Sequence, residues 1–202
     1  FLYEIYQRSE KNLTTRSTVP ILWDTKTETI VNNESADIVR ILNKSFNNIA
    51  SNDSDYSPEK YKGEIEQWNG LIYPNINNGV YACGFARTQS AYDEAVTKLF
   101  SCLDQLEAHM ANRSYMVANR LTEVDIRLIP TLIRFDIVYH THFKCNLRRI
   151  IDYPNLHNYL SRCRQLPAIK KTTHIPHIKR HYYFSHQNIN PYRIIAAGPV
   201  EY

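Results

Sequence analysis

Residues 17–43 of this 202-residue chain contain side chains suited to holding a small anionic ligand. Glu34 and Ser35 open a stretch whose apolar residues recur at helical spacing, so they mark the start of a predicted helix. The first N–H groups of a helix have no partner inside it, and together with a hydroxyl they can bind a carboxylate. A plain helix cap explains the same two residues taken singly.

The four cysteines and the histidines are the other residues that could do chemistry. Cys83, Cys102, Cys145 and Cys163 lie far apart without a C-x-x-C pair, which argues against a disulfide scaffold or zinc ribbon and favours a reducing compartment. His174, His177 and His181 are spaced three and four residues apart, with His186 nearby, which could place them on one helix face for a metal. They lack a paired carboxylate or cysteine set, so we expect no metal.

The elements that must position these residues differ between the two ends of the chain. Before the helix at Glu34, two β-rich runs flank a polar turn at residues 24–28, which predicts a strand, a turn, a strand and a helix. Pro20 lacks an N–H, so it must begin the first strand or adopt a special bond geometry. Residues 45–58 are rich in Asn, Ser and Asp, as a linker is.

From residue 59 onward the pattern is mostly helical. Apolar residues in steps of three and four predict a long helix over residues 90–110. Thr122 and Asp125 form a capping-box pattern that begins a buried helix. A helix is also predicted over residues 59–72, and Pro74 follows it, so we expect residues 76–85 to be a loop. The last helix is predicted over residues 175–184.

The composition is ordinary for a soluble globular protein. It has 43% hydrophobic and 22% charged residues, and its net charge of +4 is spread along the chain, so we expect no nucleic-acid partner. No apolar run is long enough to cross a membrane and no signal peptide opens the chain, so we expect a cytoplasmic protein.

Several ordered segments resemble one family, the xi class of glutathione transferases, also called glutathionyl-hydroquinone reductases. The segments are TVPILWD (18–24), IVNNESADIVRILN (30–43), NNGVYACGFARTQSAYDEAV (77–96), LTEVDIRL (121–128), RFDIVYHTHFKCN (134–146), DYPNL (152–156) and HIKRHYYFSHQNINP (177–191). The HFKCN and HIKRHYY segments are not general features of glutathione transferases. They therefore favour this family over its relatives.

The resemblance implies an α/β domain followed by an all-α domain. Residues 1–46 would be the C-terminal part of a thioredoxin-like, glutathione-binding domain, and residues 47–58 a linker. Residues 59–186 would be the all-helical C-terminal domain of a glutathione transferase, and residues 187–202 an extended tail. The chain begins at Phe1 without a Met and inside a predicted helix, so we expect it to be an N-terminally truncated fragment. The family also implies a homodimer.

The resemblance assigns glutathione-binding roles to four residues and catalytic roles to tyrosines of the helical domain. The bond between Val19 and Pro20 would be cis and would leave the Val19 backbone free to pair with the cysteinyl part of glutathione. Glu34 and Ser35 would hold the γ-glutamyl end. Tyr81 matches a tyrosine that the family places over the hydroquinone ring, and either Tyr182 or Tyr183 matches a second one; an edge-of-core role explains them too.

The family reduces glutathionyl-hydroquinones with a cysteine thiolate, which takes the glutathione as a mixed disulfide that a second glutathione resolves. That cysteine lies in a Cys-Pro-Trp-Ala motif upstream of the Val-Pro strand, and none of the four cysteines here matches it. We therefore expect the nucleophile upstream of residue 1 and this chain alone to be inactive. Two alternatives remain: a conjugating glutathione transferase, and a catalytically silent glutathione-transferase-like scaffold.

Overall fold

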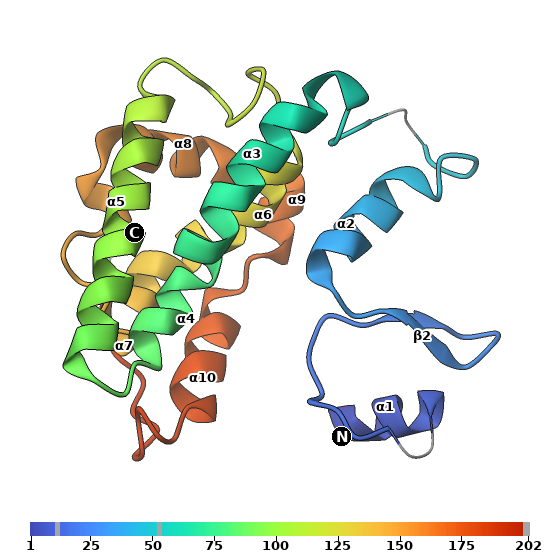
Figure 1. Ribbon diagram of the computed structural model, residues 1–202, viewed down its shortest axis with the longest axis horizontal. Helices are drawn as coiled ribbons and strands as arrows, with labels where there is room; N and C mark the ends of the chain where they lie inside the picture. Colours follow the sequence, from blue (N-terminus) through green and yellow to red (C-terminus); the bar gives the residue numbers. More distant parts are fainter. Residues whose placement is uncertain (11–12, 52–53, 200–202) are drawn as a thin grey trace. The chain divides into compact units, whose positions relative to one another are not determined.

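The computed structural model describes residues 1–10, 13–51 and 54–199. The chain divides into two compact units, Phe1–Pro58 and Glu59–Tyr202 (Figure 1). Each unit is described by itself below. No helix within the described residues is long and apolar enough to span a membrane.

The first unit contains helix α1 (Leu2–Ser9), strands β1 (Leu22–Asp24) and β2 (Thr29–Asn32), and helix α2 (Ser35–Lys44). The strands pair antiparallel, with Trp23 opposite Ile30. The Asp24 carboxylate accepts the amide of Lys26 at 2.7 Å and so fixes the turn between the strands. The predicted order of strand, turn, strand and helix is confirmed, although β1 begins only at Leu22.

The apolar core of this first unit is small. Among its described apolar residues, only Tyr6 of α1 and Ile38 of α2 are buried. Ser9 adds a polar connection, because its hydroxyl accepts the amide of Ile30 at 3.1 Å and joins the end of α1 to β2. Specific hydrogen bonds therefore contribute much of the stability of this unit.

The second unit is helical and carries the main core. Its elements are η1 (Glu59–Tyr61), α3 (Lys62–Ile72), η2 (Tyr73–Asn77), α4 (Gly79–Gly84), α5 (Gln89–Met110), α6 (Glu123–Arg134), η3 (Phe135–Tyr139), α7 (His140–His142), η4 (Ile150–Asp152), α8 (Pro154–Arg164), α9 (Pro167–Thr172) and α10 (Ile175–Ser185). The predicted seam of α5 is confirmed, since Leu99, Leu103 and Leu106 are fully buried. The α/β-plus-all-α fold class expected from the sequence is confirmed.

The prediction of a loop over residues 76–85 is wrong. The chain passes from α3 through the π-helical turn η2 directly into α4. Ile76, Val80 and Cys83 are spaced four and three residues apart and are all buried, and this packing overrides the weak helix propensity of the nearby glycines. The Asn77 side chain also donates to the Arg127 carbonyl at 2.8 Å, which ties η2 to α6.

The expected capping box at the start of α6 is present. The Asp125 carboxylate accepts the Thr122 amide at 2.8 Å and the Thr122 hydroxyl at 2.9 Å. It also accepts the Met116 amide at 3.0 Å and the Tyr159 hydroxyl at 2.9 Å. Four donors therefore surround this fully buried carboxylate, and they connect α6 to the preceding loop and to α8.

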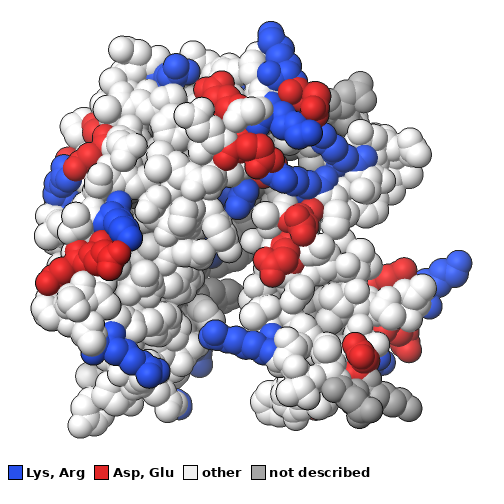
Figure 2. Space-filling model, viewed as in Figure 1, with Lys and Arg blue, Asp and Glu red and all other residues white. Residues whose placement is uncertain are grey.

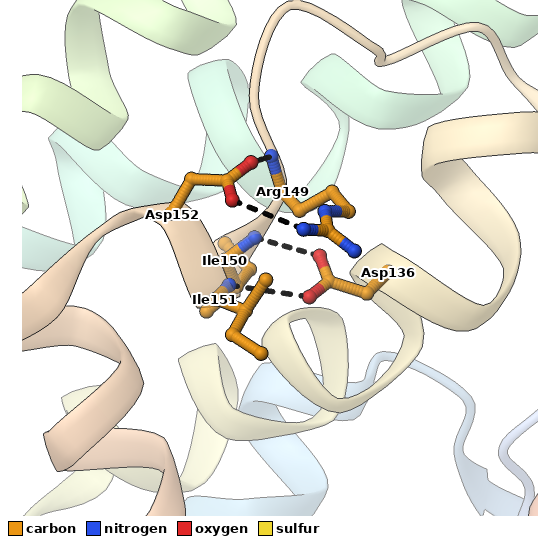
Figure 3. A network of polar contacts seen from close by, with 5 residues as sticks. All are labelled: Asp136, Arg149, Ile150, Ile151 and Asp152. Atoms are coloured by element: carbon orange, nitrogen blue, oxygen red, sulfur yellow. Dashed lines mark hydrogen bonds and ion pairs between the residues drawn. The ribbon is translucent and has the colours of Figure 1, made fainter. Parts of the chain in front are cut away.

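A second buried carboxylate fixes the segment after α7. Figure 3 shows the Asp136 side chain of η3 accepting the amides of Ile150 at 2.7 Å and Ile151 at 3.2 Å. Beside it, Arg149 and Asp152 form an ion pair at 3.2 Å that is partly exposed. Asp136 thus supplies partners for two backbone N–H groups at the start of η4, where no helical carbonyl can reach them.

The residues after α10 fold back onto that helix. The Lys179 ammonium donates to the carbonyls of Ala197 at 3.0 Å and Gly198 at 3.1 Å. The Asn190 side chain donates to the Tyr183 carbonyl at 2.9 Å.

On the face seen in Figure 2, Lys and Arg side chains are interspersed with Asp and Glu, so that face has no patch of a single charge.

Gly84 allows α4 and the end of α7 to approach closely. A Cβ atom at this position would lie 2.2 Å from an atom of the Phe143 ring and 2.9 Å from its Cβ. Those distances are far below van der Waals contact, and Phe143 is itself completely buried. The absence of a side chain at Gly84 is therefore what lets the Phe143 ring pack against α4.

We expect Gly84→Ala to destabilise the second unit by about 1 to 3 kcal/mol, because the added methyl forces a buried aromatic ring to move. Chemical denaturation of both proteins measures this difference. Gly70→Ala is the matched control, since nothing lies within 4 Å of a Cβ at that helical position. It should stabilise the unit by about 0.5 to 1 kcal/mol, and an equal loss in both variants would contradict the steric explanation.

Candidate functional site

In the first unit, the bond between Val19 and Pro20 is cis, as the resemblance implied. The Val19 residue is 74% exposed. Within the part of the chain that the structure describes, no hydrogen bond engages either backbone group of Val19. Its N–H and C=O are therefore open to a ligand that pairs with an extended backbone.

The Tyr6 hydroxyl connects the segment before Val19 with the segment before Glu34. It donates to the Thr18 carbonyl at 2.8 Å and accepts the Thr18 amide at 3.2 Å. The same oxygen accepts the Asn33 side-chain amide at 3.2 Å. Because Tyr6 is buried on α1, this one hydroxyl holds the two candidate ligand-binding segments at a fixed separation.

Glu34 and Ser35 lie at the start of α2, with Glu34 at the N-cap position. Among the described residues no side chain makes a cap hydrogen bond at this end of the helix, so the alternative of a plain Ser or Asn cap does not describe it. The Glu34 amide donates to the Asn32 side chain at 2.6 Å, which fixes the entry into the helix. Both residues are exposed, and the first amides of α2 remain available to an anion.

In the second unit, three tyrosine hydroxyls form a continuous chain. The Tyr81 oxygen lies 2.6 Å from the Tyr182 oxygen, which lies 2.8 Å from the Tyr139 oxygen. These residues come from α4, α10 and η3, which Figure 1 shows at the same end of the unit. Tyr139 is 2% exposed and Tyr182 is 6% exposed, whereas Tyr81 is 36% exposed. The chain therefore runs from the core to the surface.

Aromatic rings surround the hydroxyl chain. The Phe143 ring stacks on Tyr139 with 5.4 Å between centroids and contacts Tyr81 at 5.3 Å. Phe85, which is partly exposed, lies 6.3 Å from Tyr81 in a stacked arrangement. Burial raises the pKa of Tyr182 and of Tyr139 above the ordinary tyrosine value, so both phenols stay protonated at neutral pH. The exposed end of the chain thus offers aromatic surface and one phenol hydroxyl.

Tyr183 lies apart from this chain. Its hydroxyl is buried without a hydrogen-bond partner among the described residues, and its ring packs 4.7 Å from His142. Of the two candidates Tyr182 and Tyr183, the structure brings Tyr182 to Tyr81 and leaves Tyr183 in the packing of α10 against α7.

The histidines do not form a metal site within the described residues. No group of three or more His, Cys, Asp or Glu side chains there is placed to hold an ion. The rings of His174 and His177 lie 5.5 Å apart. His142 and His186 form a separate pair, with 3.1 Å between their ring nitrogens. Burial lowers the pKa of His142 to about 4 and also lowers the pKa of His186.

The four cysteines are free and buried. Burial raises the pKa of the Cys102 thiol to about 11 and of the Cys163 thiol to about 12. The neighbouring Cys83 thiol and burial together raise the pKa of Cys145. The hydrogen bond with Cys145 lowers the pKa of Cys83. Reactivity needs exposure as well as thiolate character, and all four side chains are buried, so none is placed as a nucleophile.

Sequence reasoning missed Tyr6, Tyr139 and Phe143. The helix predicted at the start of the chain does not single out Tyr6, although a buried tyrosine usually has a hydroxyl partner, and that could have marked it. Tyr139 and Phe143 lie in the segment RFDIVYHTHFKCN, which pointed to the family without pointing to these side chains. Their contacts join parts of the chain that are distant in sequence.

Comparison with known proteins shows the class of protein to which the chain belongs, the glutathione transferases. Residues 89–162 match the family described as the glutathione S-transferase C-terminal domain. The glutathionyl-hydroquinone reductase PcpF of Sphingobium chlorophenolicum is 47% identical to this chain over 201 residues. The glutathionyl-hydroquinone reductase YqjG of Escherichia coli is 48% identical over 199 residues. These alignments cover 100% and 98% of this chain, but only 64% and 61% of the two relatives.

Solved structures place the chain within one class. It resembles the glutathione-bound structure of YqjG with a TM-score of 0.98 and 48% identity, over 100% of this chain and 66% of that one. It resembles glutathione S-transferase Xi of Phanerochaete chrysosporium with a TM-score of 0.97 and 46% identity, over 99% of this chain and 69% of that one. The chain belongs to the xi-class glutathione transferases.

The His142 pair makes stability depend on pH. The pKa of a histidine in an unfolded chain is about 6.5, whereas the pKa of His142 in the folded state is about 4. Because the unfolded chain binds the proton more readily, stability contributed by neutral His142 is lost as the pH falls from about 6.5 toward 4. We expect the wild type to lose about 1 to 2 kcal/mol more than His142→Gln between pH 7 and pH 5.

Chemical denaturation at the two pH values measures this difference. His174→Gln serves as the control, since it removes an exposed histidine that lies outside the contact between His142 and His186. A His142→Gln variant with the same pH dependence as the wild type would rule out His142 as the source.

Proposed function

We propose that this chain belongs to a glutathione-dependent reductase that removes glutathione from glutathionyl-hydroquinones. The observation that carries the proposal is the 47% and 48% identity to two proteins named glutathionyl-hydroquinone reductase, over essentially all of this chain. The hydroxyl chain ending at Tyr81 supports it, since it offers aromatic surface and a phenol hydroxyl to a ring that bears oxygens. The whole protein would act as a cytoplasmic homodimer.

Glutathione binding is assigned to the first unit. The Val19 backbone, which is exposed and makes no hydrogen bond among the described residues, would pair with the cysteinyl residue of glutathione. Glu34, Ser35 and the first amides of α2 would hold the γ-glutamyl group. Two similar structures were solved with glutathione, one from Escherichia coli and one from Saccharomyces cerevisiae, which supports glutathione as the co-substrate.

The chemistry requires a thiolate that attacks the sulfur of the adduct. The bond between sulfur and the ring breaks, the ring carbon takes up a proton, and the glutathione remains on the enzyme as a mixed disulfide. A second glutathione then releases glutathione disulfide. The thiols of this chain are buried. The resemblance implies a nucleophilic cysteine upstream of the Val-Pro strand, and we propose that the whole protein supplies it there.

Tyr81 would assist the departure of the ring. Its hydroxyl can donate a hydrogen bond to an oxygen of the hydroquinone and stabilise the charge that develops as the bond to sulfur breaks. Tyr182 would support it through the 2.6 Å hydrogen bond. The exposed Phe85 ring, which stacks on Tyr81, provides a surface against which a quinol ring could pack.

The test uses the native protein with a glutathionyl-hydroquinone and glutathione. The reductase should release one hydroquinone and one glutathione disulfide for each adduct and each glutathione consumed. Conjugation of glutathione to an electrophilic aromatic substrate, without reduction of the adduct, would instead identify a conjugating transferase. Glutathione binding without either reaction would identify a silent scaffold, and both outcomes would refute the reductase assignment.

In the same protein, Tyr81→Phe should slow the reduction of a glutathionyl-hydroquinone by roughly 10- to 100-fold, because the variant loses the donor to the quinol oxygen. Disulfide exchange between glutathione and hydroxyethyl disulfide needs no quinol oxygen and should remain close to the wild-type rate. An equal loss in both assays would show that Tyr81 has no role specific to the quinol.

A further inference from the structure

We propose that Tyr139 is a positioning residue which fixes the direction of the hydroxyl chain, so that Tyr81 presents a hydrogen-bond donor outward and the site prefers a phenolate or quinone oxygen. This inference rests on the proposed function only in taking the ligand to be a phenol or quinone. It concerns which way the protons of the chain point, and it assigns a role to a residue that lies too deep to touch the ligand.

The argument begins with a count of protons. Three phenol hydroxyls carry three protons, and the chain contains two hydrogen bonds, Tyr139 to Tyr182 and Tyr182 to Tyr81. Each hydrogen bond uses one proton, so one proton is left over. It is on Tyr81 if the chain points outward and on Tyr139 if it points inward. If Tyr182 accepted from both neighbours, its own buried proton would have no acceptor among the described residues, so that arrangement is excluded by burial as well.

Burial decides between the two directions. Tyr139 is 2% exposed, and among the described residues only the Tyr182 hydroxyl makes a hydrogen bond of ordinary geometry with its phenol oxygen. The Tyr81 phenol also acts on Tyr139 electrostatically but makes no such bond to it. The Tyr139 ring packs against the apolar rings of Phe135 and Phe143. An inward chain would leave the Tyr139 proton without an acceptor in this apolar surrounding, which carries the full desolvation penalty of the group.

The outward direction avoids that penalty. Tyr139 donates to Tyr182, Tyr182 donates to Tyr81, and the free proton belongs to Tyr81, which is exposed enough to reach solvent or a ligand. Hydrogen bonds in a chain polarise one another, so a Tyr81 oxygen that accepts from Tyr182 is a stronger donor than an isolated tyrosine. A ligand oxygen that only accepts, such as a phenolate or a quinone carbonyl, matches this end of the chain.

The test measures the ionisation of a bound phenol and needs no thiol chemistry. 4-Nitrophenol absorbs differently as phenol and as phenolate, so absorbance reports the ratio of the two forms when it is bound to the native protein. The wild type should raise the ratio of phenolate to phenol relative to free solution. Tyr139→Phe, which retains the ring and removes the hydroxyl, should lower the bound ratio by about threefold or more.

Tyr183→Phe is the matched control. Its hydroxyl is also buried in α10 next to Tyr182, but has no hydrogen-bond partner among the described residues. Its removal should leave the ratio unchanged. Arg134, His181 and His186 also face Tyr182, and all three are retained in both variants, so they cancel in the comparison.

Three results would overturn the inference: absence of binding, a wild type that favours the neutral phenol, and equal ratios in the wild type and Tyr139→Phe. The outcome is separate from that of the proposed function. Turnover of glutathionyl-hydroquinones with an unchanged ratio in Tyr139→Phe refutes only the directed chain. A lowered ratio in a protein without turnover refutes only the reductase assignment. Thermal unfolding of both variants confirms that they are folded.

Discussion

The close contact between Gly84 and Phe143 is the constraint on which the candidate phenol site depends. A glycine on α4 lets the Phe143 ring lie against the helix backbone, and the ring then stacks on Tyr139 and contacts Tyr81. This packing sets the spacing between α4 and η3, and the Tyr182 hydroxyl on α10 fits between the other two. The apolar contact between Gly84 and Phe143 thus sets the distance between Tyr81 and Tyr139, which the Tyr182 hydroxyl bridges.

In the first unit a polar contact, rather than an apolar one, positions the candidate binding segments. The unit buries little apolar surface, and a polar atom, the Tyr6 hydroxyl, holds the segments before Val19 and Glu34 together. A ligand that contacts both segments would meet a pair of surfaces whose separation is already fixed, which reduces the entropy lost on binding. The preorganisation of each half thus depends on side chains that have no contact with the proposed ligand.

Local signals in the sequence predicted what local physics decides. The turn after Asp24, the apolar seam of α5 and the Asp125 capping box each depend on residues a few positions apart, and the structure has all three. The loop expected over residues 76–85 was wrong because buried contacts with α5 and α6 outweigh a proline and two glycines. The link from Tyr139 to Tyr182 spans 43 residues, and no local pattern could show it.

The π-helical turn η3 has a consequence for how such a site could have arisen. A π-helical turn contains one residue more than the α-helical turn it replaces, and each added residue rotates the following side chains by about 100° around the helix axis. Tyr139 and the residues after it owe their direction to the length of the chain as much as to residue type. A single inserted codon in an ancestral α-helix would suffice to turn a tyrosine from one face to another, without any change in the side chains themselves.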